Sequence, residues 1–151
     1  MTQPDVSALA RKFKIDVEIS GIWTQVKGVQ ELKPAITPSL EDDSVYDDAG
    51  WGSKTKTGLE WSLELKAVRR QSPVDVTSYD PGQEALRNAA EAFGASGQVH
   101  VRWYDRDGGA EAYDGWAEVT WAPEGGMRTA LETVTVTLSG RGARNTIANP
   151  A

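Results

Sequence analysis

Residues 21–70 read GIWTQVKGVQELKPAITPSLEDDSVYDDAGWGSKTKTGLEWSLELKAVRR, and this stretch determines the fold to expect. From Leu59 to Ala67 apolar and polar residues alternate, which is the period of a strand with one buried face. Residues 34–57, just before it, contain prolines and glycines and no periodicity of their own. A loop of that length is uncommon inside a compact domain and usually belongs to an interaction surface. The stretch therefore predicts a β domain with one long exposed loop.

Five other segments carry the residue pattern of strands. They are residues 12–18, 22–27, 98–104, 113–121 and 129–138. Turn sequences such as DRDGG at 105–109 separate neighbouring segments, as in antiparallel hairpins. The sequence therefore predicts a mainly β fold, an antiparallel β-sandwich or open barrel.

One α-helix is predicted to flank this sandwich, at residues 81–93. Asp80 is placed to cap it, and Pro81 suits the first helical position. Its apolar stripe is expected to contain Leu86, Ala89, Ala90 and Phe93. The helix is the only one that the pattern supports.

Length and composition predict a single domain over residues 1–151, with a polar N-terminal arm at 1–11 and a C-terminal arm at 139–151 that is mobile before assembly. A net charge of -6 argues against tight binding to a phosphate backbone. No apolar run approaches the roughly 18 residues that span a bilayer, and the first residues lack a secretory segment. We therefore expect no membrane association and a location in a cytoplasm until the protein is used.

The chain offers little for catalysis. The absence of cysteine excludes a disulfide scaffold, thiolate catalysis and cysteine zinc sites. The single histidine, His100, gives a weak case for a zinc site or a histidine triad, and it is expected on the solvent side of its strand. Glu60 and Glu64 are a possible acid and base, but they lie two pleats apart with no visible pocket. We therefore expect neither an enzyme nor a cofactor.

Five carboxylates gather in the predicted loop. They are Glu41, Asp42, Asp43, Asp47 and Asp48. Several oxygens together suit a divalent cation, but the EF-hand pattern is absent. A solvated loop of like charges is the favoured interpretation, so no metal site is predicted.

Six tryptophans are many for 151 residues. A row of exposed tryptophans would suit carbohydrate stacking, but Trp61, Trp103 and Trp121 lie on apolar strand faces, where core packing is the ordinary role. Trp51 in the loop and Trp116 on the polar phase of its strand are better placed for an interface.

Seven segments, in this order and spacing, resemble the lambda-type siphophage major tail (tail tube) protein family. They are WTQVKGVQEL at 23–32, YDDAGWG at 46–52, GLEWSL at 58–63, YDPGQ at 79–83, VRWYD at 101–105, AYDGWA at 112–117 and VTVTLSG at 134–140. No single segment is diagnostic. Longer members of the family carry an added immunoglobulin-like C-terminal domain, for which these 151 residues leave no room.

The resemblance implies a structural virion protein without enzymatic activity. Subunits of this family form rings, commonly hexameric, which stack into a hollow tail tube that delivers DNA to the host. Expected partners are further copies of the chain and the tape-measure, tail-tip and terminator proteins. The expected location is the virion tail, after a stage in the host cytoplasm.

The resemblance also implies that the long loop 34–57 and the terminal arms bridge successive rings. The residues expected at this contact are Glu41, Asp42, Asp43, Tyr46, Asp47, Asp48 and Trp51. Since the loop contains more acids than it can pair, basic residues of a neighbouring ring are expected to meet them. The candidates for that role are Lys12, Lys14, Arg69 and Arg70.

A channel that passes DNA should avoid tight phosphate contacts, because each one adds affinity and slows movement. The polar face of the strand after the loop is therefore expected to line the lumen. The candidates are Glu60, Ser62 and Glu64, with Glu118 on a later strand that we expect in the same sheet. Leu59, Trp61, Leu63 and Leu65 would be buried beneath them.

Other classes of function remain open on the sequence alone. One is another virion component of the same fold, such as a tail terminator or a baseplate-hub protein. Another is a carbohydrate- or protein-binding β-sandwich module, and a small acid/base enzyme is a further one. A terminator stops at one ring, whereas a tube subunit polymerises.

Overall fold

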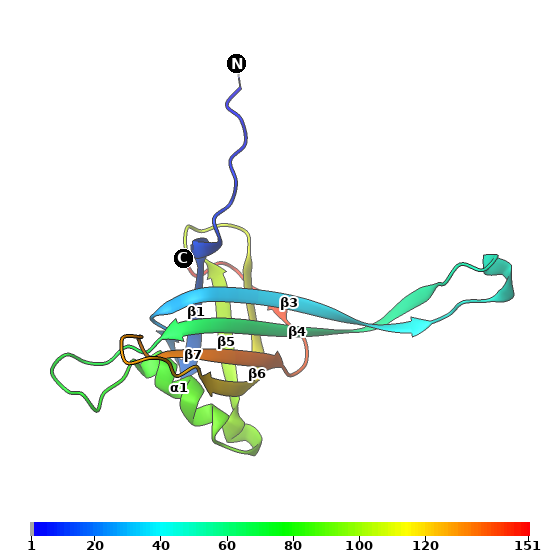
Figure 1. Ribbon diagram of the computed structural model, residues 1–151. Coiled ribbons are helices and arrows are strands. Elements are labelled where there is room, and N and C mark those ends of the chain that lie inside the picture. The colour runs from blue at the N-terminus through cyan, green and yellow to red at the C-terminus, as the bar shows by residue number, and fades with distance from the viewer. Residues whose placement is uncertain (1) are drawn as a thin grey trace.

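The computed structural model describes residues 2–151, and eight strands form one curved antiparallel sheet with an α-helix against it (Figure 1). The strand order is β2-β1-β5-β6-β7-β4-β3, with β8 paired to β6. The strands are β1 (Phe13–Ile19), β2 (Ile22–Gln25), β3 (Val29–Asp42), β4 (Lys54–Val68), β5 (Gln98–Asp105), β6 (Ala112–Pro123), β7 (Thr133–Gly140) and β8 (Asn145–Thr146). The helices are α1 (Pro81–Ala90) and the short 3-10 turns η1 (Ala10–Lys12), η2 (Tyr46–Asp48) and η3 (Gly94–Gly97). The predicted mainly β fold is confirmed.

The core lies inside the curve of the sheet and follows the alternation in the sequence. Its fully buried side chains include Trp103 of β5, Leu63 and Leu65 of β4, and Val136 and Leu138 of β7. Each side chain of this kind removes enough apolar surface from water to contribute about 1.5–3 kcal/mol before chain entropy is subtracted. The concave face of one curved sheet therefore encloses a single core.

Helix α1 is fixed to the sheet at its first turn. The Asp80 carboxylate accepts from the Gln83 N–H (3.2 Å), so the predicted cap is present. The buried Gln83 amide donates to the carbonyls of Lys27 (2.7 Å) and Val68 (2.8 Å). These bonds join the helix to the start of β3 and the end of β4.

The predicted helix was too long at its C-terminal end. The helix ends at Ala90 rather than at residue 93, and Phe93 is 95 % exposed. Gly94, in the left-handed region at φ +64°, starts η3 there. Phe93 therefore lies beyond the helical spacing and does not belong to the apolar stripe.

The prediction that residues 34–57 form a loop was wrong. β3 and β4 pair in register from Val29↔Ala67 to Asp42↔Lys54, so most of this segment is a long β-hairpin (Figure 1). β3 is an edge strand, and its prolines at 34 and 38 are tolerated there because an edge strand has one side without ladder bonds. The connection that remains is residues 43–53, around η2.

The prediction of a mobile C-terminal arm at 139–151 was also wrong. Residues 139 and 140 belong to β7, and β8 pairs with β6 at Tyr113↔Thr146. The Asn149 amide donates to the carbonyls of Asp105 and Gly109, both at 2.8 Å. Backbone and amide bonds of this kind leave no hydrophobic pattern in a sequence. Residues 2–9 of the N-terminal arm, by contrast, extend away from the domain without secondary structure (Figure 1).

Trp61 lies where β4 leaves the core, and its indole lies on backbone that has no side chains. A Cβ built on Gly115 would come within 2.6 Å of its ring, and one on Gly140 within 2.4 Å. Its Nε1 donates to the carbonyl of Gly142 (3.1 Å). The glycines of β6 and β7 thus provide the space in which this side chain packs.

Candidate assembly surfaces

The outer half of the β3–β4 hairpin has no third strand. β7 pairs with β4 only from Ser62 to Val68, so the residues of β4 before 62 pair with β3 alone, and the outer part of the hairpin projects as a two-stranded ribbon (Figure 1). Leu59, predicted to be buried beneath the polar face, is 64 % exposed on this ribbon. An isolated two-stranded hairpin is at best marginally stable in water. The ribbon is therefore a surface that gains from a partner.

Three of the five carboxylates at the tip, those of Asp42, Asp43 and Asp48, are hydrogen-bonded within the tip. The Asp42 carboxylate accepts from the Ser44 N–H (2.9 Å), and Asp48 accepts from the Val45 N–H (2.8 Å). Hydrogen bonds from Ser44 lower the pKa of Asp42. The Thr55 hydroxyl, which donates to Asp43, lowers the pKa of that carboxyl. These bonds hold the negative charges in place and favour their ionised form.

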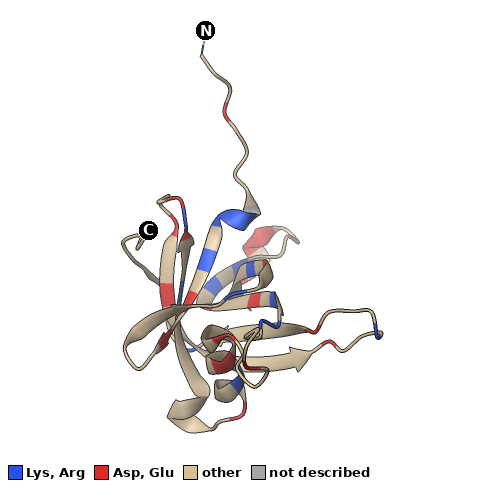
Figure 2. Ribbon diagram, turned by 90° about the vertical axis from the view of Figure 1, so that its left-hand side faces the viewer, with Lys and Arg blue, Asp and Glu red and all other residues tan. Residues whose placement is uncertain are grey.

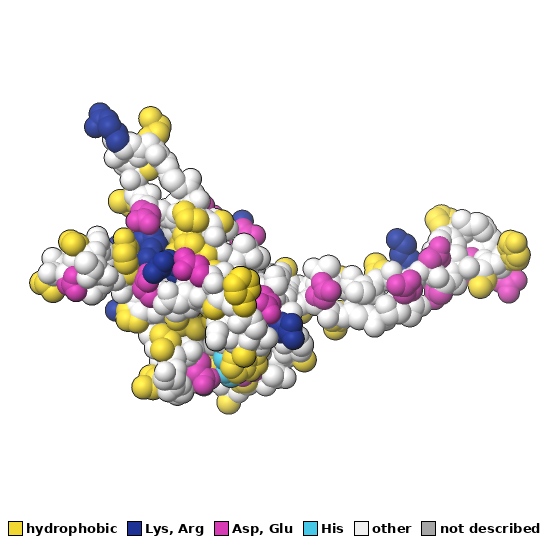
Figure 3. Space-filling model, turned by 90° about the horizontal axis from the view of Figure 1, so that it is seen from below, with side chains coloured by type: hydrophobic (Ala, Val, Ile, Leu, Met, Phe, Trp, Pro, Cys, Tyr) yellow, Lys and Arg dark blue, Asp and Glu magenta, His cyan; other side chains and the backbone are white. Residues whose placement is uncertain are grey.

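The same tip exposes apolar side chains. Tyr46 is fully exposed and Trp51 is 81 % exposed, with Val45 also exposed. Figure 3 shows hydrophobic and acidic side chains together at the far end of the hairpin. Aromatic side chains of this kind are typical anchors of protein interfaces. The seven residues predicted for the inter-ring contact therefore lie on one projecting element.

A metal site does not form there. Within residues 2–151, no group of three or more His, Asp or Glu side chains is arranged to hold a metal ion. The tip carboxylates instead bond to neighbouring N–H and hydroxyl groups.

The four predicted lumen residues share one polar face. β7 joins β4 to β6, so Ser62 lies opposite Ser139, which in turn lies opposite Glu118. Glu60 and Glu64 continue this face along β4 and are exposed. The expectation that β6 and β4 belong to one sheet is confirmed. Which way this face points in an assembly stays a prediction.

One of the basic residues expected to meet the acidic tip is not available for it. Arg69 is nearly buried, bonded to Glu84, and stacked over Tyr79 (4.1 Å) and Trp121 (5.0 Å). Arg69 therefore holds α1 to the sheet.

A polar cluster on the outer face of β1, β5 and β6 escaped the sequence analysis. His100, expected on the solvent side, has a side chain only 19 % exposed. Its Nδ1 lies 2.8 Å from Glu18 and its Nε2 lies 3.0 Å from Asp114. The ring stacks on Trp116, with centroids 4.9 Å apart. Trp116, predicted at an interface, is half exposed and covers this cluster.

A buried ion pair extends the cluster. Arg102 Nε donates to the buried Asp16 (2.9 Å), and the Tyr104 hydroxyl donates to the same oxygen (3.2 Å). Residues of opposite charge that face the same side of neighbouring strands predict such a pair, but only once the strand order is known. The cluster joins three strands.

Within residues 2–151, no helix has the length and apolar character needed to cross a membrane. No protein-family model matches the chain, and no curated protein matches its sequence. The comparison with solved structures is informative, because several tail assemblies share the fold.

The chain is similar to a subunit in the tail of an empty gene transfer agent particle with C6 symmetry, with a TM-score of 0.73 and 14 % identity over 94 % of this chain and 100 % of that one. It is similar to the SPP1 tail tube, with a TM-score of 0.68 and 14 % identity over 95 % of this chain and 81 % of that one. It also resembles a subunit of the PVC sheath–tube complex of an extracellular contractile injection system, with a TM-score of 0.56 and 8 % identity over 93 % of both chains. The chain therefore has the fold found in tail tubes.

Proposed function

We propose that this chain is a major tail tube subunit of a long-tailed phage or a related particle. Copies form rings, and the rings stack into a hollow tube through which DNA is delivered. The observation that carries this proposal is the unpartnered hairpin ribbon with exposed Tyr46 and Trp51, on a domain with the tail tube fold. A ribbon of this kind has no evident use in an isolated binding module.

Contacts between rings would come from the hairpin tip and the N-terminal arm. The arm exposes Val6 and Leu9, which are apolar side chains without cover in the monomer. Each such contact is weak by itself, but every subunit of a ring repeats it. The combined affinity between two rings is therefore much greater than that of one contact. The docked C-terminal segment takes no part in this scheme.

The lumen would be lined by the polar face that carries Glu60, Ser62, Glu64 and Glu118. Carboxylates repel phosphate groups and neutral hydroxyls do not attract them strongly, so DNA would pass without being held. The threonines of β7 lie between the two strands and add neutral polar groups to this face. No catalytic residue or cofactor is needed for such a role.

The other partners would be the proteins that set the length of the tube and close its ends: the tape-measure, tail-tip and terminator proteins. The protein would act in the virion tail after being made in the host cytoplasm.

Negative-stain electron microscopy of the concentrated protein tests the proposal. We expect hollow tubes of stacked rings, formed by the chain alone or on an added tail tip. Single rings that never stack would instead indicate a terminator. A protein that stays monomeric with and without a tail tip, and whose tryptophan fluorescence is quenched by soluble glycans, would contradict the proposal.

A further inference from the structure

A groove runs between the first half of β1 and the start of β3, at the base of the N-terminal arm. The curved sheet does not close here, because β3 forms one edge and the short β2 covers only the second half of β1. Phe13, Val29 and Leu32 line its floor. The groove therefore combines a few apolar side chains with a largely polar lining, and it is open to other molecules.

Five basic residues line this groove and make no ion pair within the part of the chain that the structure describes. They are Arg11, Lys14, Lys27, Arg70 and Arg106. The ion pairs recorded for the described residues involve other lysines and arginines. Two acids also line the groove: Glu31, which pairs with Lys33 (3.6 Å), and Asp107. Figure 2 shows Lys and Arg along η1 and β1 below the arm. A chain with a net charge of -6 thus keeps a concentrated positive surface.

The hairpin tip is the counterpart of this groove in charge, and it also exposes apolar side chains. Its five carboxylates form no ion pair among residues 2–151, and no lysine or arginine lies between 41 and 53. Tyr46, Trp51 and Val45 supply exposed apolar groups that match the apolar floor. Complementary charges around an apolar centre are the usual anatomy of a specific interface.

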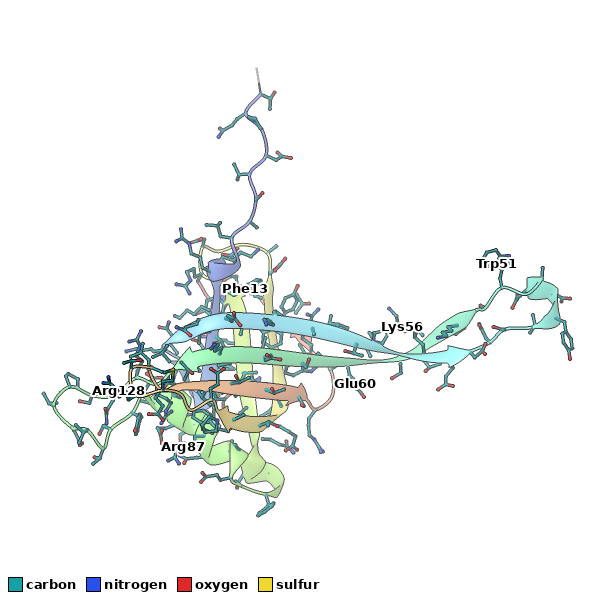
Figure 4. The ribbon with its side chains drawn as sticks, viewed as in Figure 1. Phe13, Trp51, Lys56, Glu60, Arg87 and Arg128 are labelled. Atoms are coloured by element: carbon teal, nitrogen blue, oxygen red, sulfur yellow. The ribbon has the colours of Figure 1, made fainter. Side chains whose placement is uncertain are left out.

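The tip of one copy is unable to fill the groove of the same copy. Residues 54–60 extend about 3.3 Å each, which carries the tip roughly 20 Å beyond the core. Figure 4 shows Trp51 at the far end of the hairpin and Phe13 near the base of the N-terminal arm. The two surfaces therefore meet only between molecules.

We propose that the β1–β3 groove binds the acidic hairpin tip of a second copy of this chain. The inference rests on the proposed function and names the receiving surface that stacking requires. The contact is head-to-tail, so each copy that joins leaves one tip and one groove free for the next. That geometry grows a ring or a stack and does not stop at a dimer.

Two full-length variants test the contact by changing the charge on one side each. Glu41→Lys with Asp47→Lys leaves three carboxylates against two lysines and removes most of the negative charge of the tip. Neither side chain makes a hydrogen bond that the structure records, so the internal bonds of the tip stay intact. Lys27→Glu with Arg70→Glu leaves Arg11, Lys14 and Arg106 against two new carboxylates and removes most of the unpaired positive charge of the groove. Arg128→Glu, an exposed arginine outside the groove, is the control for loss of a positive charge.

Sedimentation velocity and light scattering should show each variant associating about a hundredfold more weakly than the parent, since most of the attraction between the two charged surfaces is then removed. Mixing the two variants should restore association, because the unchanged acidic tip of the groove variant then meets the unchanged basic groove of the tip variant. The Arg128 control should assemble as the parent does. Circular dichroism and thermal unfolding confirm that each variant is folded.

Three results would overturn the inference. One is a groove variant that assembles as well as the parent, and another is a mixture in which the two variants do not associate although the parent assembles. The third is parent protein that binds a short DNA duplex through the groove while the groove variant loses only that binding. Failure of the parent to assemble at all would instead contradict the proposed function, so the two failures are distinct.

Discussion

Strand β4 changes its surroundings along its length. From Ser62 to Val68 it lies between β3 and β7, and its inward side chains are buried. From Lys54 to Glu60 only β3 pairs with it, and most of its side chains are exposed. The inner half is stabilised by a core within one molecule, whereas the outer half is held by ladder bonds and a hydrogen-bonded tip. One strand thus serves folding at one end and, in the proposed function, contact between molecules at the other.

Removing the tip is the strongest way to separate the two halves. Deletion of residues 41–48 should leave a folded domain, because the pairs of β4 with β7 lie outside it. Tube growth should be lost completely, as seen by electron microscopy. Hydrogen exchange provides the control, since core strands of the variant should keep the protection of the parent. Normal tubes from this variant would show that the hairpin tip is not the contact.

Truncating one aromatic side chain in the core and one at the tip tests whether the two parts contribute differently to folding and assembly. Trp103→Ala should lower the free energy of unfolding of the monomer by about 3–5 kcal/mol, because the side chain is buried in the core. Trp51→Ala should change it by less than about 0.5 kcal/mol but weaken assembly. Chemical denaturation and light scattering measure the two effects. A large stability loss for Trp51→Ala would mean that the tip folds together with the core.

Charge on the polar face tests its predicted place in the lumen. Glu60→Lys with Glu64→Lys should leave folding and assembly intact. Assembled tubes should then bind duplex DNA, with a salt slope that steepens by about 0.9 for each phosphate contacted. Glu132→Lys, an exposed acid outside this face, is the control. An assembled structure with both side chains on the outside of the tube would rule the assignment out.

The smallest expected effect is the response of the tip to acid. The pKa values of Asp42 and Asp43 are lowered by hydrogen bonds from Ser44 and Thr55, so these bonds favour the folded tip when both groups are ionised. That contribution is complete above the ordinary aspartate range near pH 4 and is lost as pH falls through the lowered values. NMR of the monomer should show local loss of order at the tip below about pH 4. Simultaneous loss of core signals would contradict a separate tip.

The sequence predicted the buried half of the molecule much better than the exposed half. Alternation around Leu63, Val101 and Val136 identified core strands, because one face of each is removed from water. The hairpin ribbon is exposed on both faces, so it has no alternating pattern, and Pro34 and Pro38 resembled strand breakers. The acidic and aromatic residues of the tip were predicted to form a contact surface, and they lie together on the projecting tip, with Tyr46 and Trp51 exposed.

The His100 cluster and the docked C-terminus show a second limit. Glu18, His100 and Asp114 are far apart in the chain, and only the register of β1, β5 and β6 brings them together. Asn149 is bonded to two backbone carbonyls, which no residue pattern specifies. Interactions that depend on strand order or on backbone atoms were therefore out of reach.

Trp61 lies at the base of the ribbon, at the point about which the ribbon would turn. Its ring lies against Gly115 and Gly140 at the point where the hairpin leaves the sheet. A shift of the ring would therefore change the angle at which the ribbon projects from the sheet. A lever of roughly 20 Å, from the strand rise per residue, converts a rotation of about 10° at its base into a displacement of about 3–4 Å at its end. In a stack of identical subunits that displacement recurs at every step. The pitch of the whole assembly would then be tuned by the space around a single indole.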